Sequence, residues 1–160
     1  MIITIKLLIM KKSLLLFLCS LFLILYSCSD NEENVTNNVP INVQLIGKGN
    51  IMGDYLTQQN TVITNSTQWN NLLNDLNNAN NVSDGFTETN IDFNQYMVIA
   101  VIDEVYPNGG HSIDIITATE MQQNIVIDVE KILTGNVTTV VTQPYHIVKI
   151  PKSTKPVLFQ

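Results

Sequence analysis

The segment from Met97 to Ile102 is continuously apolar, and it constrains the fold more than any other part of the chain. A short apolar run with polar residues on both sides is typical of a β-strand that is buried on both faces. The run therefore predicts a central strand, around which the remaining elements must be arranged.

Most other strand signals follow this run in the sequence. Runs that alternate or are rich in β-branched residues predict strands at 41–45, 61–63, 112–117, 125–130, 137–142 and 145–150. Glycines 47, 49 and 53 are expected to end the first of these runs in a turn or bulge. In the third run, Ile113, Ile115 and Thr117 are expected to share one face. The short spacing between the runs favours a mainly antiparallel sheet.

One segment has the periodicity of a helix. Trp69, Leu72, Leu73 and Leu76 follow the i, i+3, i+4, i+7 pattern, which places them on one stripe that can cover a sheet. Asn65 or Ser66 is expected to cap this helix, and residues 77–90 read as a polar loop. The predicted fold class is α+β, with a mainly antiparallel β-sheet and one packed helix.

The N-terminus carries an export signal. Lys11 and Lys12 precede a short apolar segment that ends in Leu25-Tyr26-Ser27-Cys28, the pattern of a bacterial lipoprotein signal. Residues 1–27 are expected to be removed and Cys28 to carry lipid, with Met1 and Met10 both open as the start. A permanent membrane anchor and export without lipid remain as alternatives, although 13–25 is shorter than the roughly 20 residues that span a bilayer.

The rest of the chain divides into a tether and a domain. Residues 28–40 are polar and acidic and predict a flexible tether, while 41–160 are long enough for a single domain with one core. The acidic start of the tether is similar to short tags that send lipoproteins to the outer face of some envelopes, or is only a solvated linker. The expected location is the bacterial cell envelope, with a lipid anchor in the outer membrane and the domain facing either the periplasm or the cell surface.

Charge and cysteine content exclude several function classes. The chain has a net charge of −6, and loss of the three lysines of the signal would leave five lysines against fourteen acidic residues, a net charge of −9. Such a surface repels phosphate backbones, so no nucleic-acid partner is expected. Of the two cysteines, Cys19 lies in the signal and Cys28 is the lipid site, which leaves no thiol for a disulfide or for catalysis.

The two histidines of the chain are candidate ligands. His111 and His146, with Asp114, have the chemistry for a metal or acid–base site. However, the alternation places His146 with Val148 and Ile150 on an inward face, which predicts a buried, hydrogen-bonded histidine. The chain has no Gly-x-Ser-x-Gly, His-Glu-x-x-His or paired Cys-x-x-Cys motif, so we expect no enzyme, no cofactor and no metal site.

The turn Pro107-Asn108-Gly109-Gly110, followed by His111, is the most distinctive local motif. Proline presets φ, and asparagine and glycine accept left-handed conformations, so the motif predicts a tight loop. One interpretation is a simple link between two strands. The other is a rigid exposed loop that contacts a partner, and it makes Pro107, Asn108, Gly109, Gly110 and His111 the candidate partner-binding residues.

Three segments, in order, are similar to the C-terminal domain of the PrcB family, named after an accessory subunit of a bacterial protease complex. They are Phe93 to Val101, Pro107 to Ile115 with its Gly-Gly motif, and Gln143 to Lys152 with its Pro-Tyr-His start, and the resemblance covers 91–160. His111 stands where the family usually has tyrosine, and Asn108 where threonine is common. The resemblance implies a β-rich, non-enzymatic envelope domain that binds or stabilises a protease.

These observations leave three hypotheses. The first is a lipid-anchored protein that acts by protein contacts, as an accessory subunit of an envelope protease. The second is a protease-inhibitor-like module, because the Gly-Gly loop also resembles the inhibitory loops of chagasin-like proteins. The third is an envelope protein that binds a small ligand or metal through His111, His146 and nearby carboxylates.

Overall fold

The computed structural model describes residues 38–160. The predicted signal at 1–27, Cys28 and most of the predicted tether lie outside the described residues. The elements are β1 (Val39–Pro40), β2 (Gln44–Ile51), β3 (Gln59–Ile63), α2 (Ser66–Asn80), the 3-10 helix η2 (Val82–Gly85), β4 (Tyr96–Ile102), β5 (Asp114–Glu120), β6 (Ile125–Glu130), β7 (Gln143–Pro151) and β8 (Val157–Phe159). Within residues 38–160, no helix is both long enough and apolar enough to cross a lipid bilayer.

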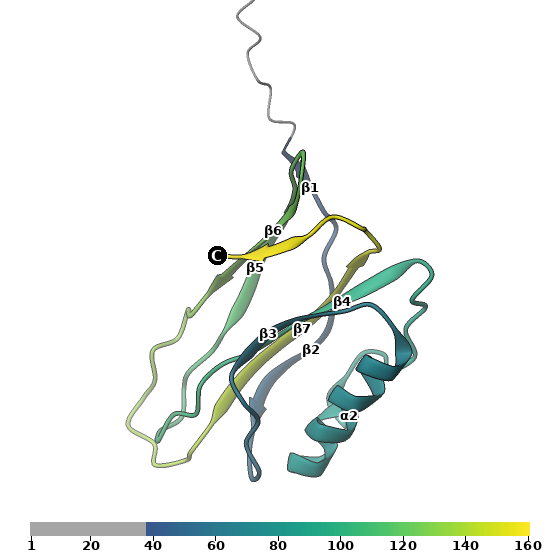
Figure 1. Ribbon diagram of the computed structural model, residues 1–160. Helices are drawn as coiled ribbons and strands as arrows, with labels where there is room; N and C mark the ends of the chain where they lie inside the picture. Colours follow the sequence, from purple (N-terminus) through teal and green to yellow (C-terminus); the bar gives the residue numbers. More distant parts are fainter. Residues whose placement is uncertain (1–37) are drawn as a thin grey trace, which may run out of the picture. The chain divides into compact units, whose positions relative to one another are not determined.

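The strands form two four-stranded sheets (Figure 1). The helix-covered sheet has the order β2-β7-β4-β3 and is antiparallel throughout. The outer sheet has the order β1-β5-β6-β8 and is antiparallel except for the parallel pair β6 and β8. The structure therefore confirms an α+β fold that is dominated by antiparallel sheet and has one α-helix in the described residues.

Strand β4 lies inside the helix-covered sheet and is buried on both faces, as predicted. On one face its even-numbered side chains pack against α2, and on the other its odd-numbered side chains pack against the outer sheet. The first set is Val98, Ala100 and Ile102, and the second is Met97, Ile99 and Val101, all at most 1% exposed. Because full burial of each large aliphatic side chain contributes about 1.5–3 kcal/mol, β4 contributes to both cores of the domain.

Helix α2 covers one face of this sheet. The side chain of Asn65 caps it by accepting a hydrogen bond from Gln68 N at 3.0 Å. Trp69, Leu72 and Leu76 are buried, and the indole N–H of Trp69 donates to Thr89 O at 2.7 Å. The predicted stripe is therefore confirmed as the packing face of the helix.

The polar loop predicted from residue 77 begins too early. Helix α2 continues to Asn80 and ends at Asn81, which has a left-handed φ of 48°. Asparagine accepts this conformation, so the local asparagine richness terminates the helix there rather than at Asn77.

The first predicted strand is also wrong in its bounds. Strand β2 begins at Gln44 and runs through Gly47 and Gly49 to Ile51, so these glycines do not end it. Its pairing with β7 shifts between Leu45 and Gly47, which is the bulge that the glycines suggested. A Cβ at Gly47 would collide with the ring of Phe86, so glycine serves here for close packing inside a strand.

Two further strand predictions fail. Residues 137–142 form a loop, because only Thr142 makes a β-bridge, to Tyr106. In β5, the register shifts between Ile115 and Thr117, so Ala118 rather than Thr117 faces the core. The extra residue in such a bulge reverses the alternation that follows it.

Candidate functional site

Two loops cross between the sheets and lie side by side. Residues 103–113 lead from β4 to β5, and residues 131–142 lead from β6 back to β7. Isolated β-bridges join them at Tyr106 with Thr142 and at His111 with Thr134. We call residues 103–113 and 131–142 the loop pair, because the two segments form one structural unit at one end of the strands.

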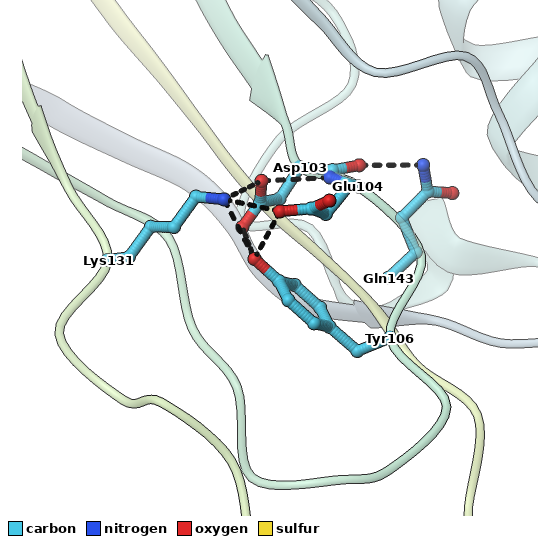
Figure 2. Close-up of polar contacts among 5 residues, drawn as sticks. All are labelled: Asp103, Glu104, Tyr106, Lys131 and Gln143. Carbon is cyan, nitrogen blue, oxygen red and sulfur yellow. Dashed lines mark hydrogen bonds and ion pairs between the residues drawn. The ribbon is translucent and has the colours of Figure 1, made fainter.

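Buried hydrogen bonds fix the base of the loop pair. Asp103 is 1% exposed, and its backbone N–H donates to Pro144 O at 2.9 Å. The fully buried amide of Gln143 donates to Asp103 O at 2.8 Å (Figure 2). It also donates to Leu56 O at 2.7 Å and accepts from Leu56 N at 2.9 Å. A buried amide satisfied in this way holds the start of one loop and the end of the other in fixed positions.

Lys131 connects the two loops through charge. Its ammonium lies 2.9 Å from Asp103 Oδ1 and 2.8 Å from Glu104 Oε1, and it donates to the Tyr106 hydroxyl at 2.8 Å (Figure 2). The Tyr106 hydroxyl in turn donates to Asp103 Oδ2 at 2.9 Å. The buried carboxylate of Asp103 is therefore paired and hydrogen-bonded, as a buried charge must be.

The pKa values of this cluster follow from the same contacts. The hydrogen bond from Lys131 is the main cause that lowers the pKa of Glu104, and the bond to Glu104 is the main cause that raises the pKa of Lys131. Burial is the main cause that raises the pKa of Tyr106. Lys131 stays charged and Tyr106 stays protonated at neutral pH, so the cluster has the properties of a structural ion pair rather than of a nucleophile or base.

The candidate residues Gly109 and Gly110 are packed against the second loop. Asn136 N donates to Gly109 O at 2.8 Å, and Gly109 N donates to Thr138 Oγ1 at 3.2 Å. A Cβ on Gly109 would lie 2.5 Å from Thr138 Oγ1, and one on Gly110, which has a φ of +80°, would lie 2.6 Å from Asn136 Nδ2. The glycine pair therefore permits a close approach of the two loops.

The other candidate residues also contribute to the loop pair. The ring of His111 stacks on Tyr106 at 3.7 Å between centroids with 7° between planes, and its Nε2 lies 3.1 Å from Asn108 Oδ1. Asn108 also donates to Asn136 O at 2.8 Å. Pro107 is exposed at the outside of the turn. A partner that contacts 107–111 would thus meet a prearranged loop.

The second loop exposes aliphatic side chains that no sequence motif marks as a site. Ile132 is 54% exposed, Leu133 55%, Val137 100% and Val140 52%. The richness of 137–142 in valine and threonine predicts a strand, which the structure does not have there. The available signal was its lack of apolar–polar alternation, since a half-buried strand would have one polar face.

His146 lies on an inward face of β7 and is hydrogen-bonded, as predicted, and that face packs against the outer sheet. Its Nδ1 accepts a hydrogen bond from Ile115 N at 3.0 Å and lies 3.4 Å from Asp114 Oδ1, and Asp114 is also ion-paired with Lys48. Burial is the main cause that lowers the pKa of His146. His111 contacts Tyr106 and Asn108 instead, and within 38–160 no three His, Cys, Asp or Glu side chains are grouped so that they could hold a metal ion.

Comparisons with models of known protein families, with curated proteins and with solved structures found no match to this chain.

Proposed function

We propose that this chain is a lipid-anchored protein of the bacterial cell envelope that acts by binding another protein, and that it has no catalytic activity of its own. We further propose that the partner is an envelope protease, which the chain assists as an accessory subunit. The signal ending at Cys28 supports the location, and the similarity of 91–160 to the PrcB family supports the partner class.

The exposed aliphatic side chains of the loop pair are the observation that carries the proposal. A fully exposed Val137 and half-exposed Ile132, Leu133 and Val140 project from loops that are fixed by Lys131 and Gln143. Apolar side chains on a prearranged support can be buried by a partner at a low cost in conformational entropy. Such an arrangement suits a protein contact better than a reaction, because the polar groups beneath it are already paired with one another.

The loop pair and β1 lie at opposite ends of β5. The loop pair adjoins the start of β5 at Asp114, whereas β1 pairs with the other end of β5 at Thr119 and Glu120. Seven residues of β-strand separate these ends by about 20 Å. The chain therefore enters the described domain, through β1, at the end of β5 remote from the loop pair.

Affinity purification from the native envelope tests the proposal. The wild-type chain should retain a protease, and a variant with Val137→Asp and Val140→Asp should lose it. Leu158→Asp is the matched control, because Leu158 is 51% exposed on β8, outside the loop pair.

An activity assay with the purified chain and the purified protease then shows whether the chain activates or inhibits the protease. Addition of the chain should raise the activity of the protease, whereas a fall would replace the accessory role by an inhibitor role. Recovery of no protein, or equal recovery by the Val137/Val140 variant and the wild type, would contradict the proposal.

A further inference from the structure

Within residues 38–160, the outer edge of β3 has none of the features that usually protect a sheet edge. Natural sheets protect their edges with short strands, proline, bulges, charged side chains or covering segments. In the outer sheet, the edge strands β1 and β8 have only two and three residues. Strand β3, in contrast, is five residues long and contains no proline, no charge and no bulge.

The other edge of the helix-covered sheet is protected. Thr87 covers part of β2, donating from its N–H to Ile46 O and from its hydroxyl to Leu45 O, each at 2.8 Å. Strand β2 also has a bulge and the charged Lys48. Of the two edges of this sheet, β3 is the one available for another strand.

The hydrogen-bonding pattern identifies the free groups of β3. Asp103 N donates to Pro144 O and Lys152 N donates to Gln95 O, so the odd-numbered residues of β4 direct their backbone groups toward β7. The backbone groups of the even-numbered residues of β4 are hydrogen-bonded to β3, where the paired residues are Gln59, Thr61 and Ile63. Asn60 and Val62 consequently direct their N–H and C=O groups away from β4, and within 38–160 no backbone hydrogen bond reaches them from another segment.

A groove of mixed character runs beside this edge. A cavity of about 240 Å³ lies between β3 and α2; its apolar lining comes from Ile63, Leu72 and Ala100, and its polar lining from Gln59, Thr61, Gln68, Asn71 and Asp75. Asp75 is the only charged residue of this lining, and in the described part of the chain it forms no ion pair. The groove therefore favours an incoming cationic side chain over an acidic one.

We infer that the edge of β3 binds an extended segment of another protein as an added strand, with a lysine or arginine side chain placed in the groove beside Asp75. Backbone bonds to Asn60 and Val62 would provide the pairing, and the groove would select the side chain. A second copy of this chain fits less well, because it would bring a second Asp75 to the same edge and because both copies carry a net negative charge. This inference does not depend on the loop pair or on the partner being a protease.

A pair of variants at Asn60 tests the inference. Asn60→Pro removes the outward N–H without removing a bond to β4, whereas Asn60→Thr changes the side chain and keeps the N–H. The full chain, purified in detergent, would be panned against a displayed library of random twelve-residue peptides. The enriched peptides should alternate β-forming residues with lysine or arginine.

The affinities of synthetic copies of these peptides decide the outcome. Asn60→Pro should weaken binding about tenfold, because it removes one backbone bond and the register that it sets. Asn60→Thr should bind like the wild type, and Asp75→Asn should weaken binding about two- to fivefold. Absence of enriched peptides, equal affinity for Asn60→Pro and the wild type, or dimerisation of the chain through β3 would each overturn the inference.

Discussion

His146 links the two sheets through one acceptor atom. Because Nδ1 accepts from Ile115 N, the neutral ring carries its proton on Nε2. Protonation of Nδ1 would break that bond and place a positive charge at a largely buried position near Lys48. The nearby Asp114 carboxylate opposes this effect, yet burial dominates and the pKa of His146 is lowered from its ordinary value of 6.5.

Stability should therefore depend on the protonation of His146. The unfolded chain binds the proton at higher pH than the folded chain, so the free energy of unfolding should fall as the pH drops through 6.5, until the folded ring also titrates. Urea unfolding at pH 7.5 and pH 5.5 measures this difference. It should shrink in His146→Asn, which keeps an acceptor but does not titrate, and an unchanged difference would contradict the role of His146.

Gly110 should be intolerant of a side chain. Its φ of +80° and the short approach to Asn136 mean that Gly110→Ala should destabilise the fold by about 1–3 kcal/mol in urea unfolding. Gly85→Ala is the control, because nothing lies within 4 Å of a Cβ there, and it should change stability by less than about 1 kcal/mol. Equal effects of the two substitutions would contradict the packed arrangement of the loop pair.

The ion pair between Lys131 and Asp103 is expected to stabilise the fold more than an ion pair between two exposed side chains does. Lys131 contacts the 1% exposed carboxylate of Asp103, whereas Lys155 and Glu120 form a pair in which both side chains are about one-third exposed or more. Removal of the partner of a buried charge costs more than removal of a solvated one. The two lysines therefore form a matched comparison.

Lys131→Met should lower the free energy of unfolding by about 1–3 kcal/mol, and Lys155→Met by less than about 1 kcal/mol. Amide hydrogen exchange should also become faster at Asp103 and Thr142 in Lys131→Met, because the base of the loop pair loses its cation. Equal stability of the two variants would show that Lys131 does not hold the loops together.

The elements that could be predicted from the sequence are those set by local periodicity. The stripe of α2 and the apolar run of β4 each occur within a few residues, so their type followed from the pattern alone. The division into two sheets did not, because pairing such as that of Gln44 with Lys149 joins residues far apart in the chain. The course of β2 through Gly47 likewise depends on Phe86, which no local pattern connects to it.

The candidate site was predictable only at one of its two loops. The Gly109-Gly110 motif marks a change of chain direction by composition, and the chain does bend at 107–109, with a positive φ at Gly110. Its packing against Asn136 and Thr138 depends on a contact across more than 25 residues, so the second loop gave no comparable signal. Asp103 and Lys131 were likewise unremarkable in sequence, although the fold makes them one ion pair.

In the proposed function, the lipid on Cys28 holds the whole molecule at the membrane, where it binds its partner. Cys28→Ser should move the protein from the membrane fraction to the soluble fraction and abolish incorporation of labelled fatty acid. The folded domain should be unaffected, because β1, the first strand of the described residues, begins at Val39, eleven residues after Cys28. Retention of Cys28→Ser in the membrane fraction would support the permanent anchor instead.

Site-specific photo-crosslinking in intact cells tests most directly whether the loop pair binds a partner. A photoreactive residue at position 137, in the loop pair, is predicted to crosslink to one envelope protein in high yield. The same residue at position 158, half exposed on β8, should give little or none of that product. Identification of the product as a protease would support the accessory role, whereas the same products from both positions, or none from position 137, would contradict binding through the loop pair.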